Sequence, residues 1–368
     1  LAFVNCFFVA CLWVLFEFVL TIMPFGFPIS LAVSQYLMPL HIQGVTFFGI
    51  YWISFLIILV NCLITVAVVL NYYRYFLVVS GILVLNICLG WCIISQTSEE
   101  SVRQANIAMI QPSIPWRFAS QSYADNYFFR QILRRLTGYV DQVLSQHEGA
   151  FTVILPELAI TDFGPSHPLV SDFVDHVTKD DDVLVMGAWV DDKNSVVSFD
   201  AFSQVKDVYF KSKLVPIFEQ QSSVLTTTLR PVSIANDVQL GSFLCYELLF
   251  PTISRQLVLN GADFLAGLSF NSWLGTSNWV VLHQAYLPFR AIESGRYALF
   301  LNNHGPSGLV DSKGRFLDQI LLNHSASIVA SVPLETEYTF FVRYPYCFVL
   351  LVCVSFIGLG YIQRRVVI

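Results

Sequence analysis

Long uninterrupted runs of apolar residues occupy the two ends of the chain. They cover roughly residues 3–24, 46–70, 75–96 and 345–362. About 20 apolar residues in a helix cross the hydrocarbon core of a bilayer, so each run is long enough to span a membrane. Because lipid offers the backbone no hydrogen-bond partners, we expect all four runs to be α-helices.

Between these runs the hydrophobic pattern alternates between two periods. Apolar residues at every second position predict strands, and apolar residues at the helical spacing predict amphipathic helices. The predicted helices cover 124–146, 168–179, 251–260 and 278–295. The predicted strands cover 106–114, 151–158, 182–192, 195–202, 207–215, 241–250, 262–271, 297–303, 308–312 and 327–334, with a turn at Lys193-Asn194. Many strands with two layers of helices predict an α/β sandwich.

Composition and charge divide the chain at the same places. Hydrophobic residues make up 55% of the sequence and charged residues 12%, and the mean hydropathy of +0.62 is typical of a membrane protein. Every Asp, Glu, Lys and Arg lies in the central region except Glu17, Arg74, Arg364 and Arg365. We therefore expect transmembrane helices over 1–96 and a globular domain over 97–343. A C-terminal transmembrane helix with a short cytoplasmic tail is expected over 344–368.

The few charged residues near the apolar runs predict how the chain is oriented. Cytoplasmic ends of membrane helices are enriched in Lys and Arg. Arg74 lies between the second and third runs, and Arg364 and Arg365 follow the last one. These ends are expected in the cytoplasm, and the central domain on the opposite side, which is the periplasm of a Gram-negative cell. Glu17 lies inside the first run, where a charge is costly. It is expected either to face other helices or a polar cavity, or to be a protonated glutamate in a packed bundle.

The charge balance and the motifs exclude some classes of function. The net charge is −6, and no basic stripe interleaved with aromatic residues occurs, so no nucleic-acid partner is expected. The sequence contains no CxxC pair and no HExxH motif, and its seven histidines show no metal-ligand spacing. A metal site is therefore not expected.

Cys245 stands in the apolar stretch GSFLCYELLF (241–250) and is the only cysteine of the central region. The other seven lie in the apolar runs, so Cys245 has no disulfide partner within the domain. A lone cysteine in a strand is most often a small buried hydrophobe. The other interpretation is a nucleophile, which needs a base to take the thiol proton and a positive charge for an oxyanion.

Three ionisable residues in apolar surroundings bear on that choice. Glu157 ends the run FTVILPEL, a position that suits a proton shuttle. Lys211 lies in the strand-like VYFKSKLVP; Lys213 alternates onto the same face, so a solvated edge strand is the other interpretation. Glu247 is expected on the same strand face as Cys245. Its charge would disfavour a thiolate unless Lys211 compensates.

The segments ILPELA, YFKSKLVPIFE and FLCYELLF, in this order, resemble the Glu–Lys–Cys constellation of the nitrilase, or carbon-nitrogen hydrolase, superfamily. The N-terminal run with LWVLFEFVL, the segments LSFNSWLG and HQAYLPFRAIESGRYALFLNNHGPSGLVDSKG, and the final apolar run resemble the apolipoprotein N-acyltransferase family. The resemblance implies a nitrilase-like αββα sandwich inserted between transmembrane helices. Because the chain begins with Leu inside an apolar run, we expect the first spans of that family to be missing.

The resemblance also implies roles for individual residues. Glu157 corresponds to the general base, Lys211 to the group that stabilises the oxyanion, and Cys245 to the thiol that accepts the acyl group. Glu219, Tyr246 and Glu247 correspond to supporting or substrate-binding residues. Of these, Glu219 is expected to orient Lys211 and Glu157.

The activity that the resemblance implies is acyl transfer in lipoprotein maturation at the bacterial inner membrane. A fatty acyl chain would move from a phospholipid, through a thioester on Cys245, to the N-terminal amine of a diacylglyceryl-cysteine apolipoprotein. No cofactor is expected; the partners are the phospholipid donor, the apolipoprotein acceptor and membrane lipids. Two alternatives remain at this stage: a membrane-tethered amidase or nitrilase-type hydrolase with the same triad, and a catalytically silent membrane scaffold.

Overall fold

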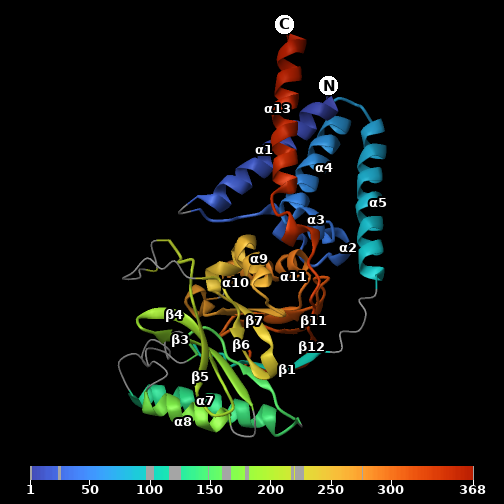
Figure 1. The fold of residues 1–368 in the computed structure, drawn as a ribbon. Helices are drawn as coiled ribbons and strands as arrows, with labels where there is room; N and C mark the ends of the chain where they lie inside the picture. The colour runs from blue at the N-terminus through green and yellow to red at the C-terminus, as the bar shows by residue number, and fades with distance from the viewer. Residues whose placement is uncertain are drawn as a thin grey trace. The chain divides into compact units, whose positions relative to one another are not determined.

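The computed structural model describes residues 2–23, 26–96, 103–115, 126–147, 149–159, 167–178, 182–216, 219, 228–275 and 277–367 (Figure 1). The chain forms two compact units. The helical unit comprises Leu1–Ser98, Ile292–Gly295 and Glu337–Ile368. The sheet unit comprises Glu99–Ala291 and Arg296–Thr336.

The helical unit contains three helices that are long and apolar enough to cross a membrane: α1 (Ala2–Ile22), α4 (Tyr51–Val69) and α5 (Arg74–Ser95). The last predicted run forms α13 (Cys347–Val367), whose described apolar part, Cys347–Tyr361, is shorter. Short helices connect these elements: η1 (Leu31–Gln35), α2 (Pro39–Ile42), α3 (Val45–Phe48) and α12 (Phe340–Arg343). The helical prediction for the apolar runs is confirmed.

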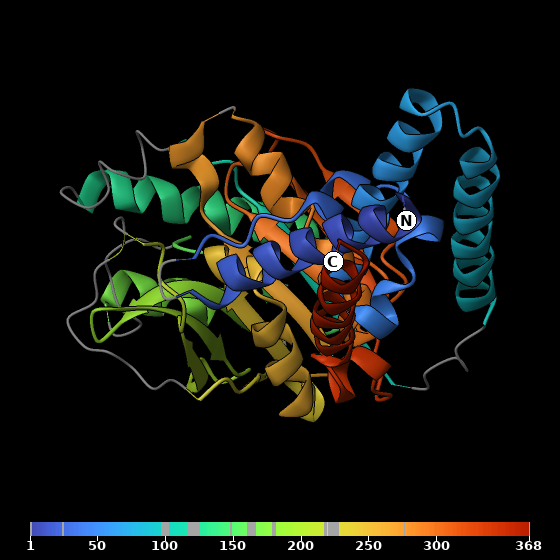
Figure 2. The same ribbon diagram turned by 90° about the horizontal axis from the view of Figure 1, so that it is seen from above.

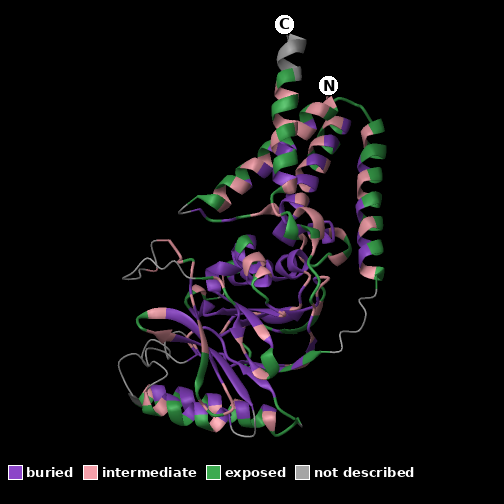
Figure 3. Ribbon diagram, viewed as in Figure 1, coloured by how far each residue is buried: buried purple, intermediate pink, exposed green. Residues whose placement is uncertain are grey.

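The long helices are exposed along much of their length (Figure 3), and many of their exposed residues are large and apolar. Leu77 is 77% exposed and Leu85 72% exposed within the unit. Such surfaces are stable against lipid rather than water. Glu17 of α1 is buried, and its carboxylate accepts hydrogen bonds from Trp13 Nε1 (2.8 Å), Ser30 Oγ (2.9 Å) and the Leu31 N–H (2.9 Å). It therefore faces protein groups, which both interpretations allow.

The sheet unit is built on two six-stranded mixed sheets. The first has the order β12-β1-β2-β3-β4-β5, with β1, β2 and β3 parallel. Its strands are β1 (Gln104–Gln111), β2 (Thr152–Ile154), β3 (Val183–Val190), β4 (Lys193–Phe199), β5 (Val205–Phe210) and β12 (Ala326–Pro333). The second has the order β11-β10-β9-β8-β7-β6, with β7, β8 and β9 parallel. Its strands are β6 (Val232–Ser233), β7 (Gln239–Leu244), β8 (Phe264–Ser269), β9 (Ala298–Asn302), β10 (Ser307–Val310) and β11 (Phe316–Ile320).

Helices cover the outer faces of both sheets (Figures 1 and 2). Helices α7 (Asn126–Leu144) and α8 (Pro168–Val177) pack on the first sheet, where Phe129, Val170 and Phe173 join a core with the strand residues. Helices α9 (Pro251–Leu259), α10 (Asn278–Gln284) and α11 (Leu287–Ser294) lie on the second sheet. This is the nitrilase-like αββα arrangement that the sequence analysis predicted.

Several element boundaries differ from the prediction. The strand predicted over 241–250 ends at Leu244, and a 3-10 helix, η4 (Cys245–Leu249), follows it. The turn expected at Lys193-Asn194 lies at Asp191-Asp192, whose φ values of 50° and 57° suit a tight hairpin. The helix predicted over 278–295 is divided between α10 and α11, and the strands β6 and β11 were not predicted. These boundaries depend on turns and short pairings, which carry little periodic signal.

Candidate active site

The predicted triad residues each follow the end of a strand, and all three are buried. Glu157 comes shortly after β2, Lys211 directly after β5 and Cys245 directly after β7. Their exposed fractions are 4%, 1% and 9%. Lys211 is therefore not a solvated edge-strand lysine, whereas Lys213 is exposed. The strand predicted over 207–215 ends at Phe210, so the two lysines do not share a strand face.

The carboxylate of Glu157 is held by three donors. Its Oε1 accepts hydrogen bonds from Asn194 Nδ2 (2.7 Å) and Lys211 Nζ (3.3 Å), and its Oε2 accepts one from the Phe270 N–H (2.9 Å). Gly187 on β3 makes room for it, because a Cβ there would lie 2.5 Å from the Cα of Glu157. These contacts hold the carboxylate in one orientation.

The ammonium of Lys211 joins two carboxylates. It donates to Glu157 and also to Glu219 Oε1 at 2.7 Å, and Glu219 Oε2 accepts the Val215 N–H at 2.8 Å. Burial by itself would lower the pKa of Lys211, but the carboxylates of Glu157 and Glu219, and Cys245 when it is ionised, more than offset this effect, so the pKa is raised. Lys211 is therefore a fixed positive charge inside the site. The Glu219 carboxylate contacts the Lys211 ammonium, and its expected role in orienting Lys211 and Glu157 stays a prediction.

Cys245 begins η4 with a φ of 48°, in the left-handed region that side chains with a Cβ rarely adopt. Such a conformation costs about 1–2 kcal/mol. Burial raises the pKa of the thiol to about 12; Glu157 and Glu219 add to this effect, whereas Lys211 and the Ser269 hydroxyl oppose it. Cys245 thus interacts with both predicted partners, and at neutral pH it is a protonated thiol.

Glu247 does not lie beside the thiol on a strand, contrary to the expectation. Since residues 245–249 form a 3-10 helix, positions two apart no longer share a face. Instead, its carboxylate accepts hydrogen bonds from the backbone N–H groups of Ser212 (2.6 Å), Lys213 (3.1 Å) and Leu244 (2.8 Å). The hydroxyl groups of Ser212 and Tyr209 donate to it as well. Burial raises the pKa of Glu247, although these hydrogen bonds and Lys211 oppose the shift.

Tyr246 is buried beside Cys245 and packs its ring edge-on against Phe250, with 5.0 Å between the ring centroids. Burial raises the pKa of its hydroxyl to about 12, so the phenol is neutral. Its structural role is therefore to help pack the turn that presents the thiol.

Sequence reasoning missed several residues of this cluster: Asn194, Ser269, Phe270, Asn271 and His283. Asn194 was assigned to a turn, although it lies in β4 and donates to Glu157. His283 lies 2.8 Å from the carbonyl oxygen of Cys245. The segments LSFNSWLG and HQAYLPF were recognised as similar to the family, but the resemblance did not distinguish these residues from packing residues.

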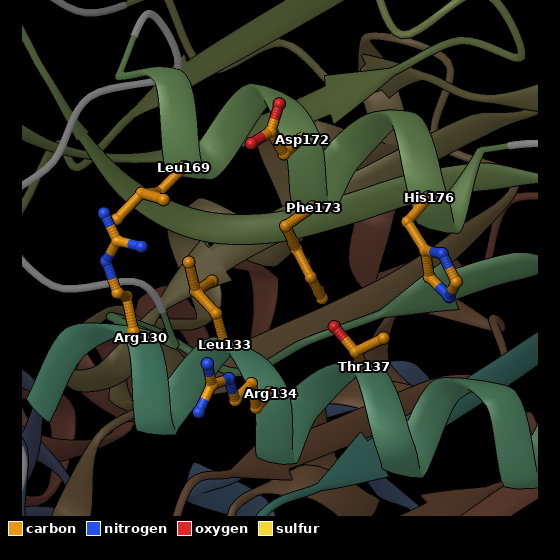
Figure 4. A pocket seen from close by; sticks show the side chains of 8 residues that line it. All are labelled: Arg130, Leu133, Arg134, Thr137, Leu169, Asp172, Phe173 and His176. Atoms are coloured by element: carbon orange, nitrogen blue, oxygen red, sulfur yellow. The ribbon is translucent and has the colours of Figure 1, made fainter. Parts of the chain in front are cut away.

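A separate shallow cavity of about 390 Å³ lies between α7 and α8 (Figure 4). Its lining includes Arg130, Arg134, Asp172 and His176, and none of the six predicted site residues. Among the residues that the structure describes, no group of three or more His, Cys, Asp or Glu side chains could hold a metal ion. The candidate active site is the set of buried residues Glu157, Lys211 and Cys245 with the groups that contact them.

Comparison with known proteins gives matches over most of the chain. Residues 106–339 match the family model described as carbon-nitrogen hydrolase, and residues 1–63 match the apolipoprotein N-acyltransferase N-terminal domain. Apolipoprotein N-acyltransferase of Shewanella oneidensis is 25% identical over 309 residues, which cover 73% of this chain and 57% of the relative. The enzyme of that name from Vibrio parahaemolyticus is 28% identical over 130 residues, 35% of this chain and 25% of the relative.

The chain spans about half the length of the curated relatives it matches, or less. Among solved structures, a carbon-nitrogen hydrolase from Helicobacter pylori G27 is similar with a TM-score of 0.49 and 17% identity. That similarity covers 67% of this chain and 94% of the other.

Proposed function

Since this chain belongs to the carbon-nitrogen hydrolase family, we propose that it is a membrane acyltransferase with Cys245 as its nucleophile. The acyl donor is a phospholipid, and the acceptor is the N-terminal amine of a diacylglyceryl-cysteine apolipoprotein. The similarity of residues 1–63 to the N-terminal domain of apolipoprotein N-acyltransferase supports this choice of substrates over those of a soluble amidase. The three long apolar helices support a reaction at a membrane.

The first half of the reaction forms a thioester. Glu157 takes the proton of the Cys245 thiol while the sulfur attacks the ester carbonyl of the phospholipid. The negative charge that develops on the carbonyl oxygen is stabilised by the ammonium of Lys211. The C–O bond of the ester then breaks, Glu157 returns the proton to the leaving oxygen, and a lysophospholipid departs.

The second half transfers the acyl group to the amine. The α-amine of the apolipoprotein attacks the thioester carbonyl, again beside Lys211, and Glu157 takes a proton from the attacking nitrogen. The C–S bond breaks, an amide forms, and the sulfur regains its proton. Two half-reactions through one covalent intermediate correspond to a ping-pong scheme.

One observation carries the proposal: the buried ammonium of Lys211 donates to Glu157 at 3.3 Å and to Glu219 at 2.7 Å, and the charges of all three act on the pKa of the buried Cys245 thiol. A thiol whose pKa is raised to about 12 does not ionise by itself at neutral pH. It therefore needs a base during attack, and the held carboxylate of Glu157 suits that task. The positive charge of Lys211 offsets the negative charge of the Glu157 carboxylate and the negative charge that develops on the oxyanion.

We place the catalytic part in 97–343, with membrane helices over 1–96 and 344–368. The arginine pattern supports a cytoplasmic C-terminus and a periplasmic catalytic part at the bacterial inner membrane.

The test is to incubate the purified chain with phospholipid and search by mass spectrometry for an acyl adduct on the peptide that contains Cys245. The adduct is expected in the chain and not in Cys245→Ala. It should disappear when a diacylated lipopeptide is added, with formation of the triacylated product. An adduct that decays to free fatty acid at the same rate without any amine would instead identify a hydrolase. Unchanged product formation by Cys245→Ala would exclude the thiol mechanism.

A further inference from the structure

Three side chains lead from the thiol of Cys245 to the carbonyl group of the same residue. Ser269 at the end of β8 interacts with the thiol and donates its hydroxyl to Asn271 Oδ1 at 2.9 Å. Asn271 Nδ2 lies 3.0 Å from His283 Nδ1, and His283 Nε2 lies 2.8 Å from the Cys245 carbonyl oxygen. All four residues are buried. We call this set, Cys245, Ser269, Asn271 and His283, the cysteine network.

The hydrogen bonds of the cysteine network can run in one direction only. A carbonyl oxygen can only accept, so His283 Nε2 carries a proton and donates it to Cys245. An amide nitrogen can only donate, so His283 Nδ1 accepts from Asn271. This assigns the imidazole to a neutral form with its proton on Nε2. Burial agrees with that assignment, because it lowers the pKa of His283 to about 4, and Lys211 lowers it further against the opposing bond to Cys245.

The backbone conformation of Cys245 explains why such a network is needed. A residue at φ 48° keeps that conformation only when its surroundings hold it there. Because the peptide group is planar, holding the Cys245 carbonyl also fixes the peptide plane that leads to Tyr246. It thereby fixes the direction in which the Cβ and the sulfur leave the backbone.

We propose that His283 is a positioning residue for the Cys245 thiol: it holds the left-handed turn through the carbonyl and, through Asn271, sets the Ser269 hydroxyl against the sulfur. The Ser269 hydroxyl has a single proton. It donates this proton to Asn271 while the thiol is protonated, and turns it to the sulfur when the thiolate forms. The proposal adds to the proposed function, since it concerns the nucleophile of that reaction, but it is tested without acyl transfer.

The alternative is that His283 only fills space. Its ring meets the edge of Phe300, with 4.9 Å between the centroids, as an ordinary core side chain would. The two roles differ in what a substitution changes. A space-filling role predicts an effect of ring size on stability, whereas a positioning role predicts an effect on the reactivity of one sulfur.

The experiment compares His283→Gln with His283→Leu in the full chain. The Gln amide keeps an N–H donor near the place of Nε2, whereas Leu has none. The rate of iodoacetamide alkylation is followed on the peptide that contains Cys245 as a function of pH. The charged and polar groups that act on this thiol are Glu157, Glu219, Lys211 and Ser269, and none of them is altered. His176→Leu, at a half-buried histidine of α8, is the matched control.

We expect His283→Leu to raise the pKa of the thiol by about one unit and to slow alkylation at fixed pH about tenfold. His283→Gln is expected within about threefold of the unaltered chain, since the neutral donor is kept, and His176→Leu is expected to match it. Equal rates in the Leu variant and the unaltered chain would overturn the proposal. Equal slowing in the Gln and Leu variants would overturn it too.

Should His283→Leu fail to fold, Ser269→Ala gives the same comparison by removing one hydroxyl group. It breaks the link between Asn271 and the sulfur, so slower alkylation of Cys245 is expected, and an unchanged rate would contradict the proposal. Failure of the proposed acyl transfer would show in the lipid-adduct experiment and leave these alkylation rates unaffected.

Discussion

The carboxylate of Glu247 accepts a hydrogen bond of 2.6 Å from the backbone N–H of Ser212, the residue that follows Lys211. Glu247 belongs to the 3-10 helix that Cys245 begins, and it also accepts the Leu244 N–H. The segment that carries the ammonium is thus fastened to the turn that carries the thiol. One buried carboxylate sets the relative positions of two residues that come from different sheets.

Replacing Glu247 by Ala is therefore expected to destabilise the sheet unit as well as the site. It leaves several buried donors without an acceptor, and each such donor costs about 1–3 kcal/mol. For a loss of about 3 kcal/mol, the melting temperature of a unit of this size should fall by roughly 6–12 °C. Thermal unfolding measures this, with Asp318→Ala at an exposed carboxylate as the control. A melting temperature that changes as little as that of the control would show that the hydrogen bonds of Glu247 do not stabilise the sheet unit.

Replacing Lys211 by Met should slow formation of the acyl-enzyme by about 10²- to 10³-fold, as removal of one oxyanion-stabilising group does in other enzymes. The substitution also leaves Glu157 and Glu219 without the charge between them. Lys211→Arg is not expected to restore the rate, because the planar guanidinium does not fit a site shaped for a compact ammonium. Single-turnover acylation with labelled phospholipid measures both variants. A Met variant within tenfold of the unaltered chain would contradict the assigned role.

The pH dependence of Cys245 provides a third prediction. Because its pKa is raised to about 12, the thiolate fraction should increase about tenfold per pH unit from pH 7 to 10 without levelling off. An ordinary thiol with a pKa near 8.5 levels off around pH 9. Alkylation of the Cys245 peptide measures this in the folded chain, and the chain unfolded in urea is the control. A plateau of the folded chain near pH 9 would contradict the prediction.

The same shift affects stability at high pH. A thiol whose folded pKa lies above its unfolded value stabilises the folded state fully below the unfolded pKa. That contribution is lost as the pH rises from about 9 toward 12. Stability should therefore decline over this window less steeply in Cys245→Ala than in the unaltered chain.

Gly187→Ala tests the close approach of β3 to Glu157. The added methyl group would lie 2.5 Å from the Cα of Glu157, which is a backbone atom and cannot turn away. Overpacking of this kind costs about 1–3 kcal/mol and should also displace the carboxylate and slow acylation. Gly138→Ala is the matched control, because nothing lies within 4 Å of the new Cβ in helix α7. That substitution should stabilise the chain by about 0.5–1 kcal/mol. Equal effects of the two alanines would refute the argument.

Much of the fold could be predicted from the sequence. The parallel strands β7 to β9 were assigned from apolar runs, and α7 and α8 from their amphipathic spacing. The polar turns were harder: the hairpin was placed at Lys193-Asn194, two residues away from Asp191-Asp192. Of the site, Glu157, Lys211 and Cys245 are all buried and Lys211 contacts Glu157, whereas their assignment as a catalytic triad stays a prediction.

The sequence by itself determined which segments form long apolar helices and which form the strands and amphipathic helices of the sheet unit, because the length and period of apolar runs reflect how much of each segment's surface is buried. It also determined which side chains could do acyl chemistry. Only the tertiary structure decided that Cys245 leaves its strand at a positive φ, that Glu247 fastens the Lys211 loop rather than facing the thiol, and that His283 reaches the Cys245 carbonyl. The last two relationships join residues more than 30 positions apart, through hydrogen bonds whose partners depend on how the loops after different strands converge. No local pattern of hydrophobic and polar residues encodes such partners.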